Sequence, residues 1–174
     1  MTSAAATPTT AHFVNDVPGR VDLTVTVPVD ADRRTAFAAI TDWAAQSRWM
    51  LGTRVWVSKG TGRMVGDELS GFTGVGRLGF LDTMTITEYR DDLVVVEHTG
   101  KVVRGAGWMG ADREAGQTRF VWGEAVDLPF GVVGRVGWLI VKPILALAVR
   151  RSLQGLAALV AAGSLPERSD SAAA

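Results

Sequence analysis

The chain has 174 residues, 47% of them hydrophobic, which suits a single domain of ordinary size. Its 18 Lys and Arg residues balance 18 Asp and Glu residues, so no net charge is present that would attract nucleic acid or an anionic membrane. With no cysteine, the sequence excludes disulfides, thiolate nucleophiles and cysteine metal sites. We therefore expect no nucleic-acid partner, no metal and no cofactor.

Both ends of the chain are rich in Ala, Ser, Thr and Pro, a composition that does not bury enough apolar surface to order itself. This predicts disordered tails at residues 1–18 and 164–174 around one domain at residues 19–163. The first thirteen residues lack the basic segment and the continuous apolar run of a secretory signal, which together with the absence of cysteine favours a cytoplasmic location.

The body of the chain begins with a strand pattern followed by a helix pattern. Apolar residues alternate with polar ones at Val21, Leu23, Val25 and Val27, which predicts a half-buried strand. The segment DADRRTAFAAITDW then changes to a helical period, with acidic residues suited to its N-terminus, and AAQSRWM predicts a second short helix.

Residues 53–127 predict a six-stranded antiparallel meander, because they are rich in Val, Thr and aromatic residues and are interrupted by turn-forming residues. The expected strands are 53–59, 66–73, 79–90, 93–100, 103–112 and 117–127, with hairpin turns at YRDD and REAGQ. The segment GVGRLG has the spacing G-x-G-x-x-G of a dinucleotide-binding loop, but a strand pattern follows it where such a loop requires a helix. We interpret it as a hairpin or bulge.

Residues 130–162 have the composition of a long helix, in which Pro143 is expected to produce a kink or start a new segment. The most apolar stretch, Val136–Val149, is short for a spanning helix and contains Lys142 next to Pro143. The interpretation is a buried helix and no spanning membrane segment, with transient membrane contact left open.

This order of elements resembles the START-like (SRPBCC) helix-grip superfamily, in particular its bacterial polyketide cyclase/dehydrase and lipid-transport branch. The segments that carry the resemblance are VPVDADRRTAFAAITDWAAQSRWM, GFLDTMTITEYRDDLVVVEHTG and FVWGEAVDLPFGVVGRVGW, within residues 20–163. The resemblance implies an α+β fold, a curved seven-stranded antiparallel sheet wrapped around a long C-terminal helix, with two short helices after strand one and an apolar cavity between sheet and helix. The resemblance implies no invariant catalytic residue that could be assigned to a position of this sequence.

One histidine lies on the face of a strand that is otherwise apolar. Counting by two places His98 with Val94 and Val96, and the same count places Glu124 with Trp122 on a later strand. Burial favours a neutral imidazole unless a buried carboxylate lies nearby, so His98 and Glu124 are the candidate acid–base pair. The alternatives are a His98 side chain satisfied by a backbone carbonyl or water, and a Glu124 side chain that is paired with Arg104 or solvated at the cavity mouth.

The chain has six tryptophans beside a single tyrosine, and an aromatic lining suits a flat, polycyclic or isoprenoid ligand. Ordinary core packing is the alternative for each of them. Asp82 is interpreted as a turn or cap residue that could also face inward. The expected ligand-binding residues are Phe37, Trp43, Trp49, Met84, Ile86, Val96, His98, Arg104, Trp108, Phe120, Trp122, Glu124 and Trp138.

Three functions are compatible with these patterns. The first is binding or transport of an apolar small molecule, such as a lipid, an isoprenoid or a polyketide-like compound. The second is a polyketide cyclase, aromatase or dehydratase that uses acid–base catalysis without a metal or a covalent nucleophile. The third is a protein-interaction module, which an exposed apolar patch on the C-terminal helix would support. The sequence predicts neither the ligand nor the oligomeric state.

Overall fold

The computed structural model describes residues 20–100, 103–127 and 132–165. The tails expected at residues 1–18 and 164–174 lie outside these residues, apart from Ser164 and Leu165. The elements in chain order are β1 (Arg20–Pro28), α2 (Arg33–Ile40), the 3-10 helix η1 (Gln46–Arg48), β2 (Thr53–Lys59), β3 (Glu68–Val75), β4 (Leu78–Tyr89), β5 (Leu93–His98), β6 (Gly105–Glu114), β7 (Gln117–Asp127) and α3 (Val132–Ala161).

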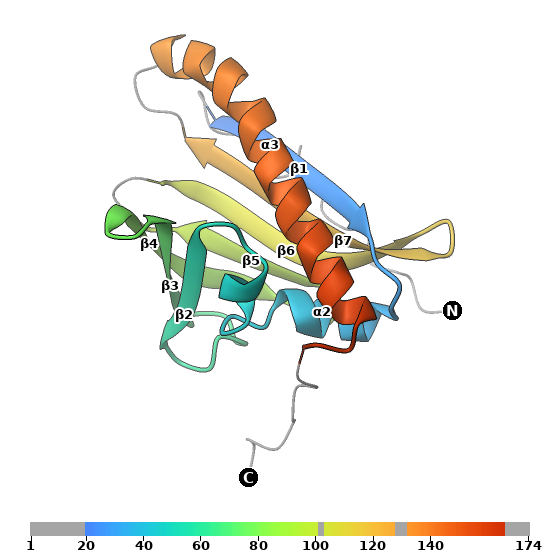
Figure 1. The fold of residues 1–174 in the computed structure, drawn as a ribbon. Helices are drawn as coiled ribbons and strands as arrows, with labels where there is room; N and C mark the ends of the chain where they lie inside the picture. Colours follow the sequence, from blue (N-terminus) through green and yellow to red (C-terminus); the bar gives the residue numbers. More distant parts are fainter. Residues whose placement is uncertain (1–19, 101–102, 128–131, 166–174) are drawn as a thin grey trace.

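The seven strands form one antiparallel sheet in the order β1-β7-β6-β5-β4-β3-β2, and α3 lies across one face of it (Figure 1). The predicted α+β class, the meander and the long C-terminal helix are confirmed, and each predicted strand is present with its ends shifted by at most two residues. The second short helix is a 3-10 turn of three residues, 46–48. The first strand forms one edge of the sheet and pairs with the last, with Val25 opposite Trp122.

Local sequence explains where these elements begin and turn. The Asp32 side chain accepts a hydrogen bond from the backbone N–H of Thr35 at 2.9 Å and so caps the N-terminus of α2. The segment GVGRLG forms the β3–β4 hairpin, in which Gly76 has φ +62° and Val75 pairs with Leu78. The hairpin interpretation is confirmed, and no helix follows these glycines.

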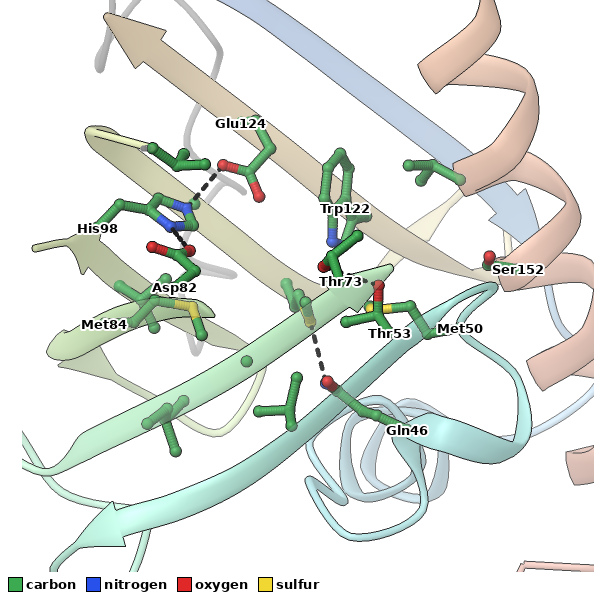
Figure 2. A pocket seen from close by; sticks show the side chains of 18 of the residues that line it. Gln46, Met50, Thr53, Thr73, Asp82, Met84, His98, Trp122, Glu124 and Ser152 are labelled. Atoms are coloured by element: carbon green, nitrogen blue, oxygen red, sulfur yellow. Dashed lines mark hydrogen bonds and ion pairs between the residues drawn. The ribbon is translucent and has the colours of Figure 1, made fainter. Parts of the chain in front are cut away.

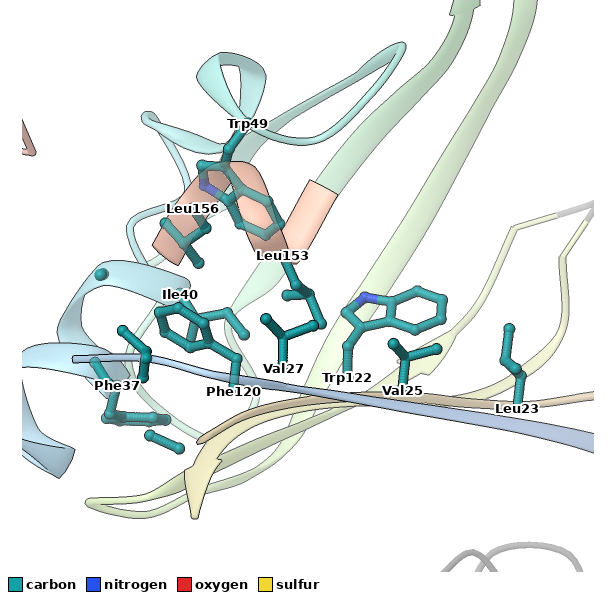
Figure 3. Packing of buried hydrophobic residues seen from close by; sticks show 14 residues of the cluster. Leu23, Val25, Val27, Phe37, Ile40, Trp49, Phe120, Trp122, Leu153 and Leu156 are labelled. Atoms are coloured by element: carbon teal, nitrogen blue, oxygen red, sulfur yellow. The ribbon is translucent and has the colours of Figure 1, made fainter. Parts of the chain in front are cut away.

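The main hydrophobic core lies between the sheet and the C-terminal half of α3 (Figure 3). Leu153 and Leu156 of α3 are fully buried, and they pack with Trp49, Ile40 and Phe120 in one cluster. A fully buried Leu side chain stabilises the fold by about 1.5–3 kcal/mol relative to an exposed one. This half of α3 is therefore anchored on the sheet.

The N-terminal half of α3 is different, because it presents large apolar side chains to solvent. Leu139 is 74% exposed and Ile140 and Ile144 are each 66% exposed. The expectation of a buried helix is therefore wrong for this half. Periodicity cannot predict this outcome, since an apolar helix face looks the same in a sequence whether or not anything covers it.

The helix also runs through Pro143 as one element of 30 residues, so no new segment starts there. One helix in the described chain, Val136–Ala161, is long and apolar enough to cross a membrane by length and composition, with 26 residues and a mean hydropathy of 1.5 over an 18-residue stretch. The expectation that the apolar stretch is too short is therefore wrong, because the helix continues past Val149. The burial of Leu153 and Leu156 against the sheet nevertheless shows that part of the helix belongs to the core.

Candidate functional site

A cavity of about 520 Å³ lies between the inner face of the sheet and α3. Its walls come from η1 and the loop after it, from the inner faces of β2–β7, and from one side of α3 (Figure 2). Most of the lining side chains are apolar, and the polar ones include Gln46, Thr53, Asp82, His98 and Glu124. The arrangement is an apolar pocket with a few placed polar groups, as in many small-molecule sites.

Most of the residues expected to bind a ligand border this cavity: Trp43, Trp49, Met84, Val96, His98, Arg104, Trp108, Trp122, Glu124 and Trp138. Arg104 is an exposed residue, and Trp138, on α3, is half-buried. Glu124 does not pair with Arg104 but with His98.

Three expected ligand-binding residues do not line the cavity. Phe37 and Phe120 lie in the core cluster beneath α3, where the Phe37 ring meets Tyr89 edge-on at 5.7 Å. Ile86 is completely buried in a second cluster with Leu69. Periodicity identified the inward-facing positions of α2 and of the strands. It cannot distinguish positions that other side chains cover from positions that border the cavity.

Trp108 borders the cavity, but its ring packs elsewhere. It pairs with Gly123 across β6 and β7, and its ring lies over that glycine. The ring belongs to a cluster with Leu93, Val95, Val121 and Ala125, on the face of the sheet opposite Val94 and Val96. Trp108 therefore stabilises the outer face of the sheet, and its neighbours Gly107 and Met109 share the inner one.

Three strands bring Asp82, His98 and Glu124 together at one end of the cavity (Figure 2). Met84 of β4 pairs with His98 of β5, so Asp82, two residues before Met84, faces the same side. His98 Nδ1 lies 2.5 Å from Asp82 Oδ2, and His98 Nε2 lies 2.8 Å from Glu124 Oε2. We call these three residues the charged triad.

Gly107 makes the longer of these two links possible. Glu124 lies on β7 and His98 on β5, with β6 between them, and the β6 residue paired with Glu124 is Gly107. A Cβ at Gly107 would lie 3.0 Å from His98 Nε2 and 3.2 Å from both carboxylate oxygens of Glu124. The missing side chain therefore leaves room for His98 and Glu124 to meet above the strand.

His98 is positively charged in the folded protein at neutral pH. Burial opposes the charge, but the negative charge of Glu124 and the hydrogen bonds to Asp82 and Glu124 outweigh burial and raise the pKa of His98 from 6.5 to about 10. Both ring nitrogens then donate to carboxylates. His98 has no nitrogen left to accept a proton from a ligand, so the hypothesis that it acts as a neutral base is not supported, and its partners are neither a backbone carbonyl nor water.

Asp82 is neither a turn nor a cap residue, because it lies within β4 and faces the cavity, the second of the two possibilities that the sequence left open. Gln46 is a site residue that the sequence patterns did not identify. The signal that could have found Asp82 is its period-two relation to Met84, which was assigned to the cavity. Gln46 was missed because η1 is too short to show a periodic pattern. Within the described residues, Asp82 Oδ1 and Gln46 Oε1 are buried without a hydrogen-bond partner, and no group of His, Asp and Glu is suited to hold a metal ion.

Comparisons with solved structures agree with the observed fold. The di-domain aromatase/cyclase StfQ of steffimycin biosynthesis aligns with a TM-score of 0.65 at 11% identity, covering 83% of this chain and 52% of StfQ. A Thermus thermophilus protein, TTHA0849, aligns at 0.61 with 15% identity over 84% and 99% of the two chains. A major latex-like protein of Panax ginseng aligns at 0.51 with 9% identity over 76% and 98%. At these identities the likeness concerns the fold alone, and the chain spans about half the length of StfQ.

A search of curated proteins found none that matches the chain. A family model described as polyketide cyclase / dehydrase and lipid transport matches residues 20–161, which is most of the sequence. The predicted helix-grip resemblance is thereby confirmed, and the chain belongs to the polyketide cyclase/dehydrase and lipid-transport family.

Proposed function

We propose that the protein binds an apolar small molecule, of lipid, isoprenoid or polyketide type, in the cavity between the sheet and α3. The observation that carries this proposal is an apolar cavity of about 520 Å³ with a charged triad at one end. Burying about 300 Å² of apolar ligand surface is worth about 7 kcal/mol before the cost of association. Micromolar affinity then needs few polar contacts.

The first test is native mass spectrometry of freshly purified protein, followed by extraction and identification of any released compound. An apolar fluorescent probe measures uptake if the protein is purified empty. Gly71→Phe is the matched variant, because Gly71 lines the cavity and a Cβ there would make ordinary contacts with Met84 and Val55 at 3.5 and 3.6 Å. Probe uptake by the wild type that is lost in Gly71→Phe supports binding in this cavity, and no uptake by the wild type refutes it.

Acid–base catalysis is the alternative use of the same cavity. The observation in its favour is Glu124, which has one carboxylate oxygen bound to His98 and the other without a described partner. That oxygen could accept a proton from carbon beside a ligand carbonyl, as cyclisation or dehydration of a polyketide requires. StfQ, which shares the fold, is named as an aromatase/cyclase, and this supports the alternative. Turnover of a short polyketide by the wild type but not by Glu124→Gln would favour the enzyme.

The exposed half of α3 favours a second function, contact with an anionic membrane surface. Val136–Ala161 contains no acidic residue. Its basic residues are Lys142 in the exposed half and Arg150 and Arg151 in the half that packs on the sheet. The β3–β4 hairpin likewise presents two apolar side chains, Val75 and Leu78, each 84% exposed, with Arg77 between them in the sequence. Apolar side chains accompanied only by positive charge suit a bilayer that contains acidic lipid.

Sedimentation with vesicles tests this contact. We expect the protein to bind vesicles of phosphatidylcholine with phosphatidylglycerol and to bind pure phosphatidylcholine less. Ile140→Asp should abolish binding, whereas Val65→Asp, at an equally exposed apolar residue in the β2–β3 loop, should not. Absence of vesicle binding combined with a dimer by light scattering would refute the membrane proposal and favour the interaction-module alternative.

A further inference from the structure

The charged triad leaves an excess of negative charge at one end of an apolar cavity. Two carboxylates, Asp82 and Glu124, face one imidazolium, His98. All three side chains are largely buried, with exposed fractions of 11%, 14% and 7% respectively. Charge in such surroundings is poorly screened by solvent and acts strongly on any polar group brought next to it.

Glu124 is the member of the triad that a ligand can reach. Its Oε2 binds His98, and Figure 2 shows the other carboxylate oxygen turned toward the cavity, on the side of Trp122. Asp82 Oδ1, by contrast, is buried and lies against Gly100. A ligand that enters the cavity therefore meets one carboxylate oxygen that no described donor satisfies.

The other charged residues at the cavity do not cancel this charge. Asp127 is bound by Arg20, with Arg20 Nε 2.7 Å from Asp127 Oδ1, so that pair is neutral. Arg104 lines the cavity but is an exposed residue, and water screens its charge. Among the described lining residues the excess therefore stays with the triad.

We propose that the cavity selects ligands whose inward polar group donates a hydrogen bond, an amine or a hydroxyl on an apolar body, and discriminates against carboxylates. This inference rests on the proposed ligand-binding function. A hydroxyl or ammonium group would satisfy the free oxygen of Glu124, and an ammonium would also balance the excess charge. A fatty-acid carboxylate at the same place would bring two anions together without a cation between them.

Three probes with the same twelve-carbon chain test the selection: dodecylamine, 1-dodecanol and dodecanoate. Their affinities are measured at neutral pH by displacement of an apolar fluorescent probe. We expect the amine and the alcohol to bind at least about tenfold more tightly than the acid. This comparison uses the wild-type protein and does not depend on any variant folding.

Two variants locate the effect. Glu124→Gln should bring dodecanoate to within a few-fold of the alcohol, while Glu97→Gln, which removes the same charge from an exposed position on the other face of β5, should leave the discrimination unchanged. Equal binding of the three probes, or preference for the acid, overturns the inference and leaves the cavity as a binding site. If none of the probes binds and no apolar dye is taken up, both the proposed ligand-binding function and this inference are refuted.

Discussion

The triad should make the stability of the protein fall as pH rises from neutral toward 10. The perturbation is the triple variant Asp82→Asn, His98→Gln, Glu124→Gln, which removes all three charges and keeps side chains of similar shape. The pKa of His98 is raised from 6.5 in an unfolded chain to about 10 in the fold. Its stabilising contribution is therefore fully present below pH 6.5 and is lost as pH rises through about 10.

The magnitude follows from proton linkage. At a pH well inside this window the folded protein holds one proton on His98 that the unfolded chain has released, so the free energy of unfolding falls by about 1.4 kcal/mol per pH unit. Across the whole window the change is on the order of 5 kcal/mol.

The assay is urea unfolding of the wild type and the triple variant at several pH values between 6.5 and 10. Subtracting the free energy of unfolding of the triple variant from that of the wild type cancels the contributions of groups outside the triad that titrate alike in both proteins. A measurement on the wild type alone is the NMR titration of the His98 ring. A difference that does not change with pH, or a His98 ring that loses its proton near its usual value, would refute the assignment of an imidazolium between two carboxylates.

Three further outcomes follow from the packing. Gly107→Val should destabilise the protein by about 1–3 kcal/mol, because a Cβ placed 3.0 Å from His98 Nε2 forces the ring and Glu124 apart; unchanged urea unfolding would contradict this. Phe37→Ala should cost about 3–5 kcal/mol through the core cavity that it leaves, yet leave probe affinity nearly unchanged, since Phe37 does not line the ligand cavity. Gly71→Phe should have a free energy of unfolding within about 1 kcal/mol of the wild-type value, while probe uptake disappears. Loss of stability together with uptake would mean that the phenylalanine disrupts the sheet instead of filling the cavity.

The sequence alone predicts the order of elements and the face of each strand that turns inward. It does so because side-chain alternation is set by backbone geometry within a few residues, as at Val94, Val96 and His98. The same local rule placed Trp122 and Glu124 on the inner face. Turn residues such as Gly76 marked the hairpins, because only a few residue types adopt a positive φ there.

What only the tertiary structure decided is which inward positions meet each other and which meet empty space. Asp82 reaches His98 through the β4–β5 register, and Glu124 reaches it across Gly107 on a strand that neither of them belongs to. The charge state of His98 depends on both contacts. The structure excludes Phe37 from the predicted site and adds Asp82 to it for the same physical reason. The burial, the partners and the pKa of a side chain are set by atoms that are distant in sequence, and no local sequence pattern predicts them.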